Sequence, residues 1–342
     1  MFRQRTERSR LQEVAELAGV GIATVGRVLN ERGGVKPETA RKVIAAAREL
    51  GLPRILPSPY QRVLRFEVLL SRPDLPLIGR MSREFSILSE SLGRTALILR
   101  SILADDRAEH FAERMRTTEA DAVITYAPNK EPVLEAAATL VARGIPLITL
   151  ISDLPAHLRL TYAGPDHRAS GLTAGWFIAR MAKPGEVLVL CNHQQYQAHL
   201  MRLQGLKDAL TRHSDQHTIA EVIDEGDQGR MSSLLLKAAV RRYQRVTAIY
   251  DAGAAHQAVE AVIKQYPLGS RPTFIGHELT DQTRRMIDEG TMDLAIDQNP
   301  ERQARFALET LLAYFKIDDR PILPNTSGQA PFTVHGPYNI GI

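Results

Sequence analysis

Several ionisable and amide side chains of this 342-residue chain stand directly after short apolar runs that are typical of buried strands. Carboxylates and amides accept hydrogen bonds from paired hydroxyl groups, and a guanidinium fork donates to two acceptors at once. Such side chains, gathered in one place, could bind a sugar, a sugar acid or a polyol. The candidates are Arg202, on a predicted helix, and the strand-end residues Ser71, Arg72, Asp153, Asp251, His277, Glu278 and Gln298.

The chemistry of these residues is predicted to be binding rather than catalysis. The sequence holds no Walker phosphate loop, no G-x-S-x-G elbow and no H-E-x-x-H pair. Gly19-Val20-Gly21 begins like a dinucleotide fingerprint, but Thr24 stands where the third glycine belongs, and a helix precedes it. Cys191 is the only cysteine and the histidines lack metal-ligand spacing, so we expect neither a metal nor a cofactor.

From residue 66 onward, short apolar runs alternate with helical patterns, and these elements must position the polar side chains. The expected strands are Phe66–Leu70, Ala96–Leu99, Ala122–Tyr126, Leu147–Leu150, Val187–Cys191, Glu221–Ile223, Ala248–Tyr250, Thr273–Ile275 and Leu294–Ile296. The helical patterns include Glu131–Arg143, Gly171–Met181, Met201–Thr211, Met231–Tyr243, His256–Tyr266 and Arg302–Phe315. This alternation predicts an α/β fold of doubly wound sheets, and about nine strands fit two sheets better than one. We expect Trp176 and Cys191 to be buried in the core.

Two such sheets would form two lobes with a ligand cleft between them, because open α/β sheets bind ligands beyond the carboxyl ends of their strands. We place the first passage between the lobes near Gly164 and the return near Gln298, and we expect the last segment to cross once more. The expected lobes are residues 66–164 with 298–320 and residues 165–297 with 321–342.

A different pattern occupies Leu11–Asn30, where apolar residues at positions 11, 14, 15 and 18 share one face of a helix. Gly19 permits a sharp turn, and a second short helix follows it. This is the spacing of a helix-turn-helix, which presents its second helix to the DNA major groove. The residues predicted to contact DNA there are Gly21, Ile22, Ala23, Thr24, Arg27 and Asn30.

A third helix is predicted to begin at Lys36-Pro37-Glu38, because proline suits the first helical position and glutamate the positive end of the helix dipole. Gly51 ends it, so residues 1–51 are expected to form a small all-α head. The ten residues before Leu11 are polar and rich in arginine, and we expect them to be frayed.

The charge of the chain is divided unevenly between residues 1–65, which are the head and its linker, and the remainder. Residues 1–65 hold 13 Lys and Arg against 6 Asp and Glu, a net charge of +7, whereas the rest of the chain holds 30 against 33, a net charge of −3. A basic head on a slightly acidic body is the pattern expected of a DNA-binding module joined to a small-molecule domain.

The head resembles the DNA-binding head of LacI/GalR-type transcriptional regulators, on EVAELAGV, ATV, RVLN and the following VKPETARKVIAAARELGL. Most of residues 66–316 resembles the periplasmic-binding-protein-like core of the same family, especially its ribose-binding-like branch. The matching segments are Gly144-Ile145-Pro146, Ser152-Asp153-Leu154-Pro155, Gly164-Pro165-Asp166, Arg202-Leu203-Gln204-Gly205-Leu206 and Asp297-Gln298-Asn299-Pro300. The resemblance implies that Arg202, in the R-x-x-G motif, contacts the effector and that Gln298 is the glutamine at the lobe crossover.

The head departs from the pattern of that family at Gly21, Gly26 and Lys36, where the family commonly has serine. Glycine caps a helix poorly and costs about 1 kcal/mol in a helix interior, so we expect a loose head that orders fully on DNA. In the core, Asp251 replaces an asparagine and Glu278 an aspartate, which leaves the identity of the ligand open.

Residues 52–65, LPRILPSPYQRVLR, are the expected linker, and Pro53, Pro57 and Pro59 preclude a regular helix before residue 59. The resemblance implies a short hinge helix that inserts a leucine into the minor groove. Leu64 is the candidate for that leucine, because Gln61-Arg62-Val63-Leu64 partly matches the family pattern. Leu56 and a plain proline-stiffened tether are the alternatives.

The function expected from these features is that of a DNA-binding transcriptional regulator, a repressor controlled by a sugar-like effector. Its expected partners are operator DNA, the effector and a second copy of the chain in a dimer or tetramer. We expect a cytoplasmic protein without a membrane partner, because no apolar run approaches the ~20 residues of a membrane span and no secretory signal is visible. The alternatives are a solute-binding protein of the same core fold and a sugar-modifying enzyme.

Overall fold

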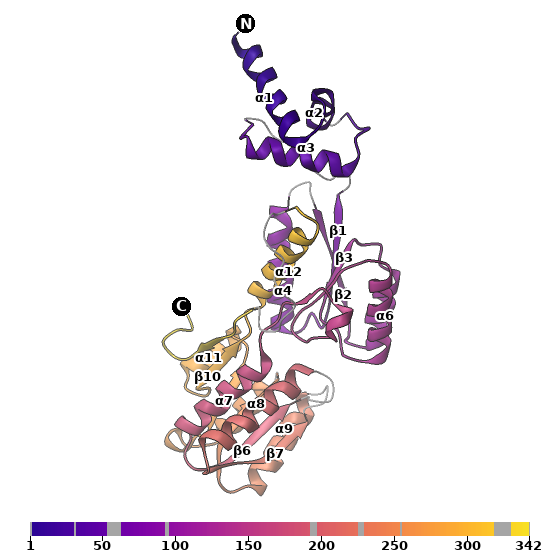
Figure 1. Cartoon of the computed structure of the whole chain (residues 1–342). Helices are drawn as coiled ribbons and strands as arrows, with labels where there is room; N and C mark the ends of the chain where they lie inside the picture. Colours follow the sequence, from indigo (N-terminus) through magenta and orange to yellow (C-terminus); the bar gives the residue numbers. More distant parts are fainter. Residues whose placement is uncertain are drawn as a thin grey trace. The chain divides into compact units, whose positions relative to one another are not determined.

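The computed structural model describes residues 2–30, 32–52, 63–92, 96–191, 197–224, 229–253, 255–317 and 330–341 (Figure 1). It divides into two compact units, Met1–Arg65 with Ser89–Ile98 and Phe66–Leu88 with Leu99–Ile342. Three helices form the head within the first unit. Two sheets with their covering helices form the two lobes of the core.

The head consists of α1 (Phe2–Ala18), α2 (Ile22–Leu29) and α3 (Pro37–Glu49). Val14, Val25 and Val43 are fully buried at its centre, together with the small residues Ala15 and Ala47. These side chains share the inward faces of the three helices and pack together as the core that the sequence predicts. Gly19 lies between α1 and α2 with φ +65°, a left-handed conformation that glycine adopts without steric cost.

The expectation of a frayed segment before Leu11 was wrong, because α1 begins at Phe2. Residues 2–18 contain no glycine or proline, and arginine, glutamine and glutamate are good helix formers, so the helix continues toward the N-terminus.

Replacing Gly26 by alanine is expected to stabilise α2. A Cβ added at Gly26 would meet no atom within 4 Å, so alanine removes the glycine penalty of about 1 kcal/mol without a clash. Hydrogen exchange of the α2 amides in the free chain should slow about fivefold. Gly19→Ala is the matched control and should speed exchange, because its φ is left-handed. Unchanged exchange in Gly26→Ala would contradict this account of the head.

The first lobe has a five-stranded sheet in the order β2-β1-β3-β4-β5. Its elements, in chain order, are β1 (Leu64–Ser71), α4 (Pro76–Ser91), β2 (Ala96–Leu103), α5 (Ala108–Thr117), β3 (Ala122–Thr125), α6 (Glu131–Ala142), β4 (Leu147–Thr149), the 3-10 turn Ala156–Leu158 and β5 (Thr161–Tyr162). Strands β1, β3, β4 and β5 pair in parallel, and α5 and α6 pack on one face through Phe111 and Leu140.

The second lobe has a six-stranded sheet in the order β11-β10-β9-β8-β6-β7. Its elements are α7 (His167–Met181), β6 (Gly185–Cys191), α8 (Gln197–His213), β7 (His217–Asp224), α9 (Gly229–Arg242), β8 (Val246–Asp251), α10 (His256–Ile263), the 3-10 turn Leu268–Ser270, β9 (Thr273–His277), α11 (Asp281–Asp288), β10 (Leu294–Asp297) and β11 (Thr333–His335). Only β11 is paired antiparallel among the registers described for this sheet.

Alternation along β6 shows why helices cover both faces of the second sheet. Val187 and Val189 pack with residues of α7 and α8, whereas Leu188 and Leu190 pack with residues of α9 and α10. Successive strand residues point to opposite faces, so a continuous apolar run requires cover on both sides. This confirms the doubly wound α/β fold.

Helix α12 (Pro300–Tyr314) follows β10 of the second sheet and packs against the first lobe. Arg305 of α12 donates to Glu84 of α4 at 2.6 Å, and the ring of Phe315 stacks on Phe66 of β1 at 5.6 Å between centroids. Figure 1 shows α12 beside α4. The chain then returns to the second sheet as β11.

Two expectations about single residues were wrong. Leu64 is the first residue of β1 and is 6% exposed, so β1 begins two residues earlier than expected and this leucine belongs to a strand rather than to the linker. Trp176 is 41% exposed on α7, where Arg180 lies 5.5 Å from its ring centroid. The alternative leucine, Leu56, lies outside the described residues. Cys191 is buried, as expected.

In the part of the chain that the structure describes, no helix combines the length and the apolar character needed to cross a membrane.

Candidate functional site

Residues with left-handed backbone stand at the carboxyl ends of strands in both lobes. Arg72 follows β1 with φ +52°, and Ile151 follows β4 with φ +54°. Glu278 follows β9 with φ +68°, and Asn299 follows β10 with φ +52°. This conformation is strained for residues other than glycine, above all for the β-branched Ile151, and such strain concentrates at functional sites. It marks the strand edge at which ligands of open α/β sheets bind.

Arg202 of α8 is the centre of the polar side chains at this edge. It is 3% exposed, its Nη1 donates to the carbonyl oxygen of Ala252 at 2.8 Å, and its Nε has no hydrogen-bond partner among the described residues. Two glycines set its position, because a Cβ at Gly171 of α7 would overlap the Arg202 backbone and a Cβ at Gly205 would overlap that of Arg168. The close α7–α8 packing therefore places a buried cation with an unused donor beyond β8.

Histidines from two elements stand beside this arginine. The Nε2 atom of His277 lies 2.7 Å from the hydroxyl of Tyr250, and its Nδ1 has no hydrogen-bond partner in the part of the chain that the structure describes. His167, at the start of α7, donates from Nε2 to the carbonyl of Ile151, so its unpartnered Nδ1 presents a lone pair. Burial, with the positive charge of Arg202 adding to it, holds the pKa of both histidines well below the usual value. Both imidazoles are neutral.

His256 differs from the other two histidines because it has a carboxylate partner. Its Nδ1 lies 2.9 Å from Oδ2 of the fully buried Asp251, and its Nε2 donates to the His277 carbonyl. Burial alone would lower the pKa of His256, but the negative charge and hydrogen bond of Asp251 outweigh it and raise the pKa. Asp251 also accepts from the Gly253 amide at 2.9 Å. This ion pair therefore fixes the chain beyond β8.

Glu278 and Gln298 form the second half of the site. The Gln298 amide donates to Oε1 of Glu278, and no described residue is a hydrogen-bond partner of the Glu278 Oε2 atom. Burial, with the neighbouring charge of Asp297 adding to it, raises the pKa of Glu278 to about 8. Both residues are at least nine-tenths buried. We call Arg202, His167, His277, Glu278 and Gln298, with Asp251, His256 and Tyr250 behind them, the polar cluster.

Replacing Glu278 by glutamine is expected to remove a pH dependence from the stability. Because the pKa of Glu278 is higher in the folded chain than its ordinary value of 4.5, the folded chain binds the extra proton, and stability falls as pH rises from about 4.5 to about 8. Chemical unfolding of the wild type should lose up to about 1.4 kcal/mol per pH unit more than that of Glu278→Gln across this window. Glu289→Gln, on an exposed carboxylate, is the control. Parallel curves for wild type and Glu278→Gln would contradict the assignment.

Three predicted residues of the first lobe already have nearby partners. The Ser71 hydroxyl lies 2.9 Å from that of Tyr126, and Arg72 pairs with Asp74 at 3.0 Å. Asp153 accepts from Thr149 at 2.8 Å and pairs with Arg159 at 2.6 Å. No contact with the polar cluster is described for Ser71 or Arg72, whereas Asp153 and Arg202 both act on the pKa of Tyr162. The structure thus gathers Arg202, Asp251, His277, Glu278 and Gln298, with Asp153 nearby.

Residues that the sequence patterns do not indicate also belong to this region. The side chain of Gln303 accepts from the Ile151 amide and donates to the Gln298 carbonyl, both at 2.9 Å, and so connects the segment after β4 to the segment after β10. His167 follows Asp166, which caps α7 through the Ala169 amide, and that capping position is its one local signal. The contact of His256 with the His277 carbonyl spans 21 positions and that of Gln303 with Ile151 spans 152 positions, so no spacing rule identifies these contacts.

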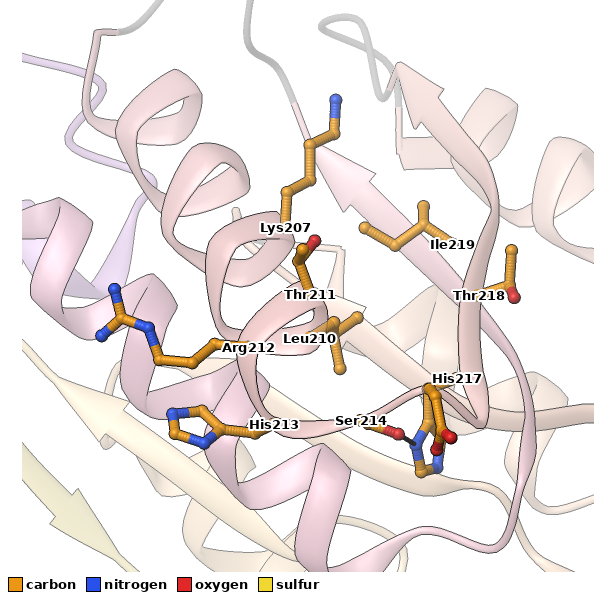
Figure 2. Close-up of a pocket in the computed structure, with 10 residues that line it drawn as sticks. Lys207, Leu210, Thr211, Arg212, His213, Ser214, His217, Thr218 and Ile219 are labelled. Carbon is orange, nitrogen blue, oxygen red and sulfur yellow. Dashed lines mark hydrogen bonds between the residues drawn. The ribbon is translucent and has the colours of Figure 1, made fainter.

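The described residues contain no group of three or more potential ligands for a metal ion. A separate groove of about 740 Å³ lies between the end of α8 and the start of β7, and Figure 2 shows Lys207 and Thr211 on its helical side and Ile219 on its strand side. This groove shares no residue with the polar cluster. Its His217 already has both ring nitrogens engaged, by Ser214 at 2.7 Å and the Lys183 carbonyl at 3.0 Å.

A second candidate site is the outward surface of α2 in the head. Gly21, Ile22, Ala23 and Arg27 are exposed and Thr24 is half-buried, whereas Val25, Val28 and Leu29 face the core. Asn30 is exposed, and its amide donates to the Gly26 carbonyl at 2.8 Å, where it closes the end of α2. The exposed face of α2 carries mostly small side chains and one cation, Arg27, so this helix can approach the edges of base pairs in a major groove.

Two protein families match separate parts of the chain. Residues 104–318 match the periplasmic binding protein domain, and residues 10–52 match the lacI family of bacterial regulatory proteins. A sucrose operon repressor of Pediococcus pentosaceus is 26% identical over 125 residues, which are 35% of this chain and 38% of that protein. The match thus spans well under half the length of that relative.

Solved structures share the fold of the core at low sequence identity. A glucose-galactose binding protein of Geobacillus stearothermophilus is 17% identical with a TM-score of 0.73, covering 82% of this chain and all of that one. A periplasmic solute-binding protein of Actinobacillus succinogenes with bound D-allose is 16% identical with a TM-score of 0.71, covering 81% of this chain and 99% of that one. One of Burkholderia graminis, in complex with D-arabinose, is 14% identical with a TM-score of 0.73, covering 82% and 99%.

Proposed function

Because the chain belongs to the periplasmic binding protein domain family and carries a lacI-family regulatory domain, we propose that it is a transcriptional repressor whose affinity for operator DNA is controlled by a sugar-like effector. The observation that carries this proposal is the presence of two distinct sites in one chain. One is the exposed face of α2 in a head that, with its linker, carries a net charge of +7 over residues 1–65, and the other is a buried cluster with unused hydrogen-bonding atoms.

The polar cluster supports an effector rich in hydroxyl groups. A hydroxyl both donates and accepts, so it can use the free Nε donor of Arg202 and also the lone pair of His167 and the Oε2 atom of Glu278. Three of the similar structures carry glucose and galactose, D-allose or D-arabinose in their names, which fits the same chemistry. We place the effector beyond the carboxyl ends of β4, β8, β9 and β10, with Arg202 and Gln298 as its principal contacts and Asp153, Asp251, His277 and Glu278 around it.

The proposed mechanism couples two binding equilibria. DNA binding favours one arrangement of the lobes and heads, and effector binding favours another, so each ligand changes the affinity of the other by the same factor. We propose that the protein acts in the cytoplasm as a homodimer, because helix-turn-helix heads read two half-sites about one helical turn apart. The proposed domain limits are residues 1–51 for the head, 52–63 for the linker, which ends where β1 begins at Leu64, and the remaining residues for the two lobes.

The alternative is a solute-binding protein, which is what the similar structures are. The presence of the head is evidence against this alternative, because a basic helix-turn-helix has no role in binding a solute. The proposed function includes no enzyme activity. It also gives Leu64 no role in contacting DNA, because this side chain is buried in β1.

The direct test is selection of DNA by the full-length chain from a library of random-sequence duplexes. We expect enrichment of one motif with two-fold symmetry and half-sites one helical turn apart. Enrichment of no motif, with the chain folded and able to bind a sugar, would support the solute-binding alternative instead.

Replacing Arg27 by alanine is expected to weaken binding of that motif. If Arg27 contacts a guanine edge, the loss should be about 1–3 kcal/mol and preference should relax at one base position. Arg48→Ala, on an exposed arginine of α3, is the matched control. Titrations against single-base variants of the motif measure both effects. A uniform loss across all variants would mark a phosphate contact, and no loss would exclude Arg27 from the interface.

A further inference from the structure

Arg80 of α4 uses its whole guanidinium group to join elements that are far apart in the chain. Nε and Nη2 donate to the two carboxylate oxygens of Glu301, each at 2.8 Å. Nη1 and Nη2 donate to the two oxygens of Asp297 at 2.7 and 3.0 Å. Nη1 also donates to the Leu279 carbonyl at 3.1 Å. A guanidinium has five N–H donors, so this arginine is saturated.

The Leu279 backbone is held on both sides by this arrangement. Its carbonyl accepts from Arg80, and its amide donates to Oδ1 of Asp297 at 3.1 Å. Leu279 directly follows Glu278, whose left-handed φ of +68° needs support from its surroundings. Asp297 directly precedes Gln298. The two residues that Arg80 holds are therefore each one position away from a side chain of the polar cluster.

The elements joined by Arg80 belong to different lobes. Arg80 lies on α4, and Glu301 lies in the first turn of α12, which also contacts α4 through Arg305 and Glu84. Leu279 and Asp297 lie at the carboxyl ends of β9 and β10 in the second sheet. If Glu278 or Gln298 moves when a ligand binds, the neighbouring Leu279 or Asp297 moves with it. The hydrogen bonds from Arg80 to these two residues would then transmit the movement to α4.

We propose that Arg80 is a positioning residue of the effector site, which fixes the backbone of Glu278 and Gln298 and connects ligand contact at these residues to helix α4. The coupling half of this statement rests on the proposed function, whereas the positioning half does not. Arginine is required because its planar fork pairs with two carboxylates and a carbonyl at once, which the single ammonium of lysine cannot reproduce. If Arg80 only held the helices together, replacing its guanidinium group would change neither the hydrogen exchange of the Leu279 amide nor the affinity for the sugar.

Arg80→Lys in the full-length chain tests this proposal, with Arg305→Lys as the matched control. Arg305 also joins α4 and α12, through Glu84, but has no described contact with Leu279 or Asp297. In the first arm, hydrogen exchange is followed without any sugar. We expect the Leu279 amide to exchange about tenfold faster in Arg80→Lys, with no change in the α5 and α6 amides or in Arg305→Lys. Unchanged exchange at Leu279 would overturn the positioning role.

In the second arm, D-glucose, D-galactose, D-allose and D-arabinose are titrated as probes. For a sugar that binds the wild type, we expect Arg80→Lys to bind that sugar about tenfold more weakly. We also expect the sugar to change the operator affinity of Arg80→Lys little or not at all. Arg305→Lys should keep the wild-type sugar affinity and the wild-type effect of the sugar on operator affinity. Equal sugar affinity and an equal effect on the operator in Arg80→Lys would overturn the proposal. Should none of these sugars bind the wild type, the sugar assignment of the proposed function fails, and the exchange arm alone decides the role of Arg80.

Discussion

Arg202→Ala is expected to abolish the response to the effector while operator binding stays near normal. The wild-type side chain is buried at the centre of the polar cluster and offers an unused Nε donor, so a bound hydroxyl would lose a charge-assisted hydrogen bond at a buried position. We expect the affinity for the effector to fall about a hundredfold, equivalent to about 3 kcal/mol. Calorimetric titration of a sugar that binds the wild type measures this loss.

The control for Arg202 is a nearby arginine in an exposed ion pair. Arg168 of α7 pairs with Asp208 of α8 near the surface, and both side chains are more than two-fifths exposed. Arg168→Ala should change neither the effector affinity nor the operator affinity, because exposed pairs contribute little. A normal effector response in a folded Arg202→Ala variant would remove Arg202 from the site.

Operator binding is expected to weaken steeply as salt is raised. Neutralised phosphates release condensed counterions, so the logarithm of the binding constant falls with the logarithm of salt by about 0.9 for each phosphate contacted. If the basic N-terminal part of the chain, with a net charge of +7 over residues 1–65, contacts about six phosphates, the affinity should fall about a thousandfold between 50 and 200 mM salt. Titration of the selected operator at several salt concentrations gives the slope.

The sugar titration supplies the internal control for this salt effect. An uncharged ligand in a buried cluster releases no counterions, so its affinity should stay nearly constant over the same salt range. A flat salt response of operator binding would show that the basic head is not the surface that contacts DNA.

The patterns that the sequence predicts well depend on contacts between residues close in the chain. Val14 and Val25 follow the helical period of the head, and the run from Val187 to Cys191 has the length and character of a buried strand. The predicted positions of Asp251, His277 and Glu278 follow from the rule that parallel strands share a carboxyl edge. The structure places these three residues near Arg202, and their role as a ligand site stays a prediction.

The remaining features could not be predicted because their causes are distant in sequence or ambiguous locally. Arg80 meets Asp297 across 217 positions, and no periodicity indicates such a pairing. Leu64 follows a proline-rich segment that resembles a hinge, but tertiary packing draws it into β1. Trp176 lies on a largely apolar helix whose outward side cannot be identified from spacing alone, and the structure places this ring at the surface.

The measurement that tests the central claim most directly is the affinity of the full-length chain for its selected operator, with and without a sugar that binds the core, at fixed salt. We predict that saturating sugar changes the operator dissociation constant by about 5- to 150-fold, and that saturating operator changes the sugar dissociation constant by the same factor. A sugar that binds tightly and leaves operator affinity unchanged would contradict the account, because the two sites would then be uncoupled.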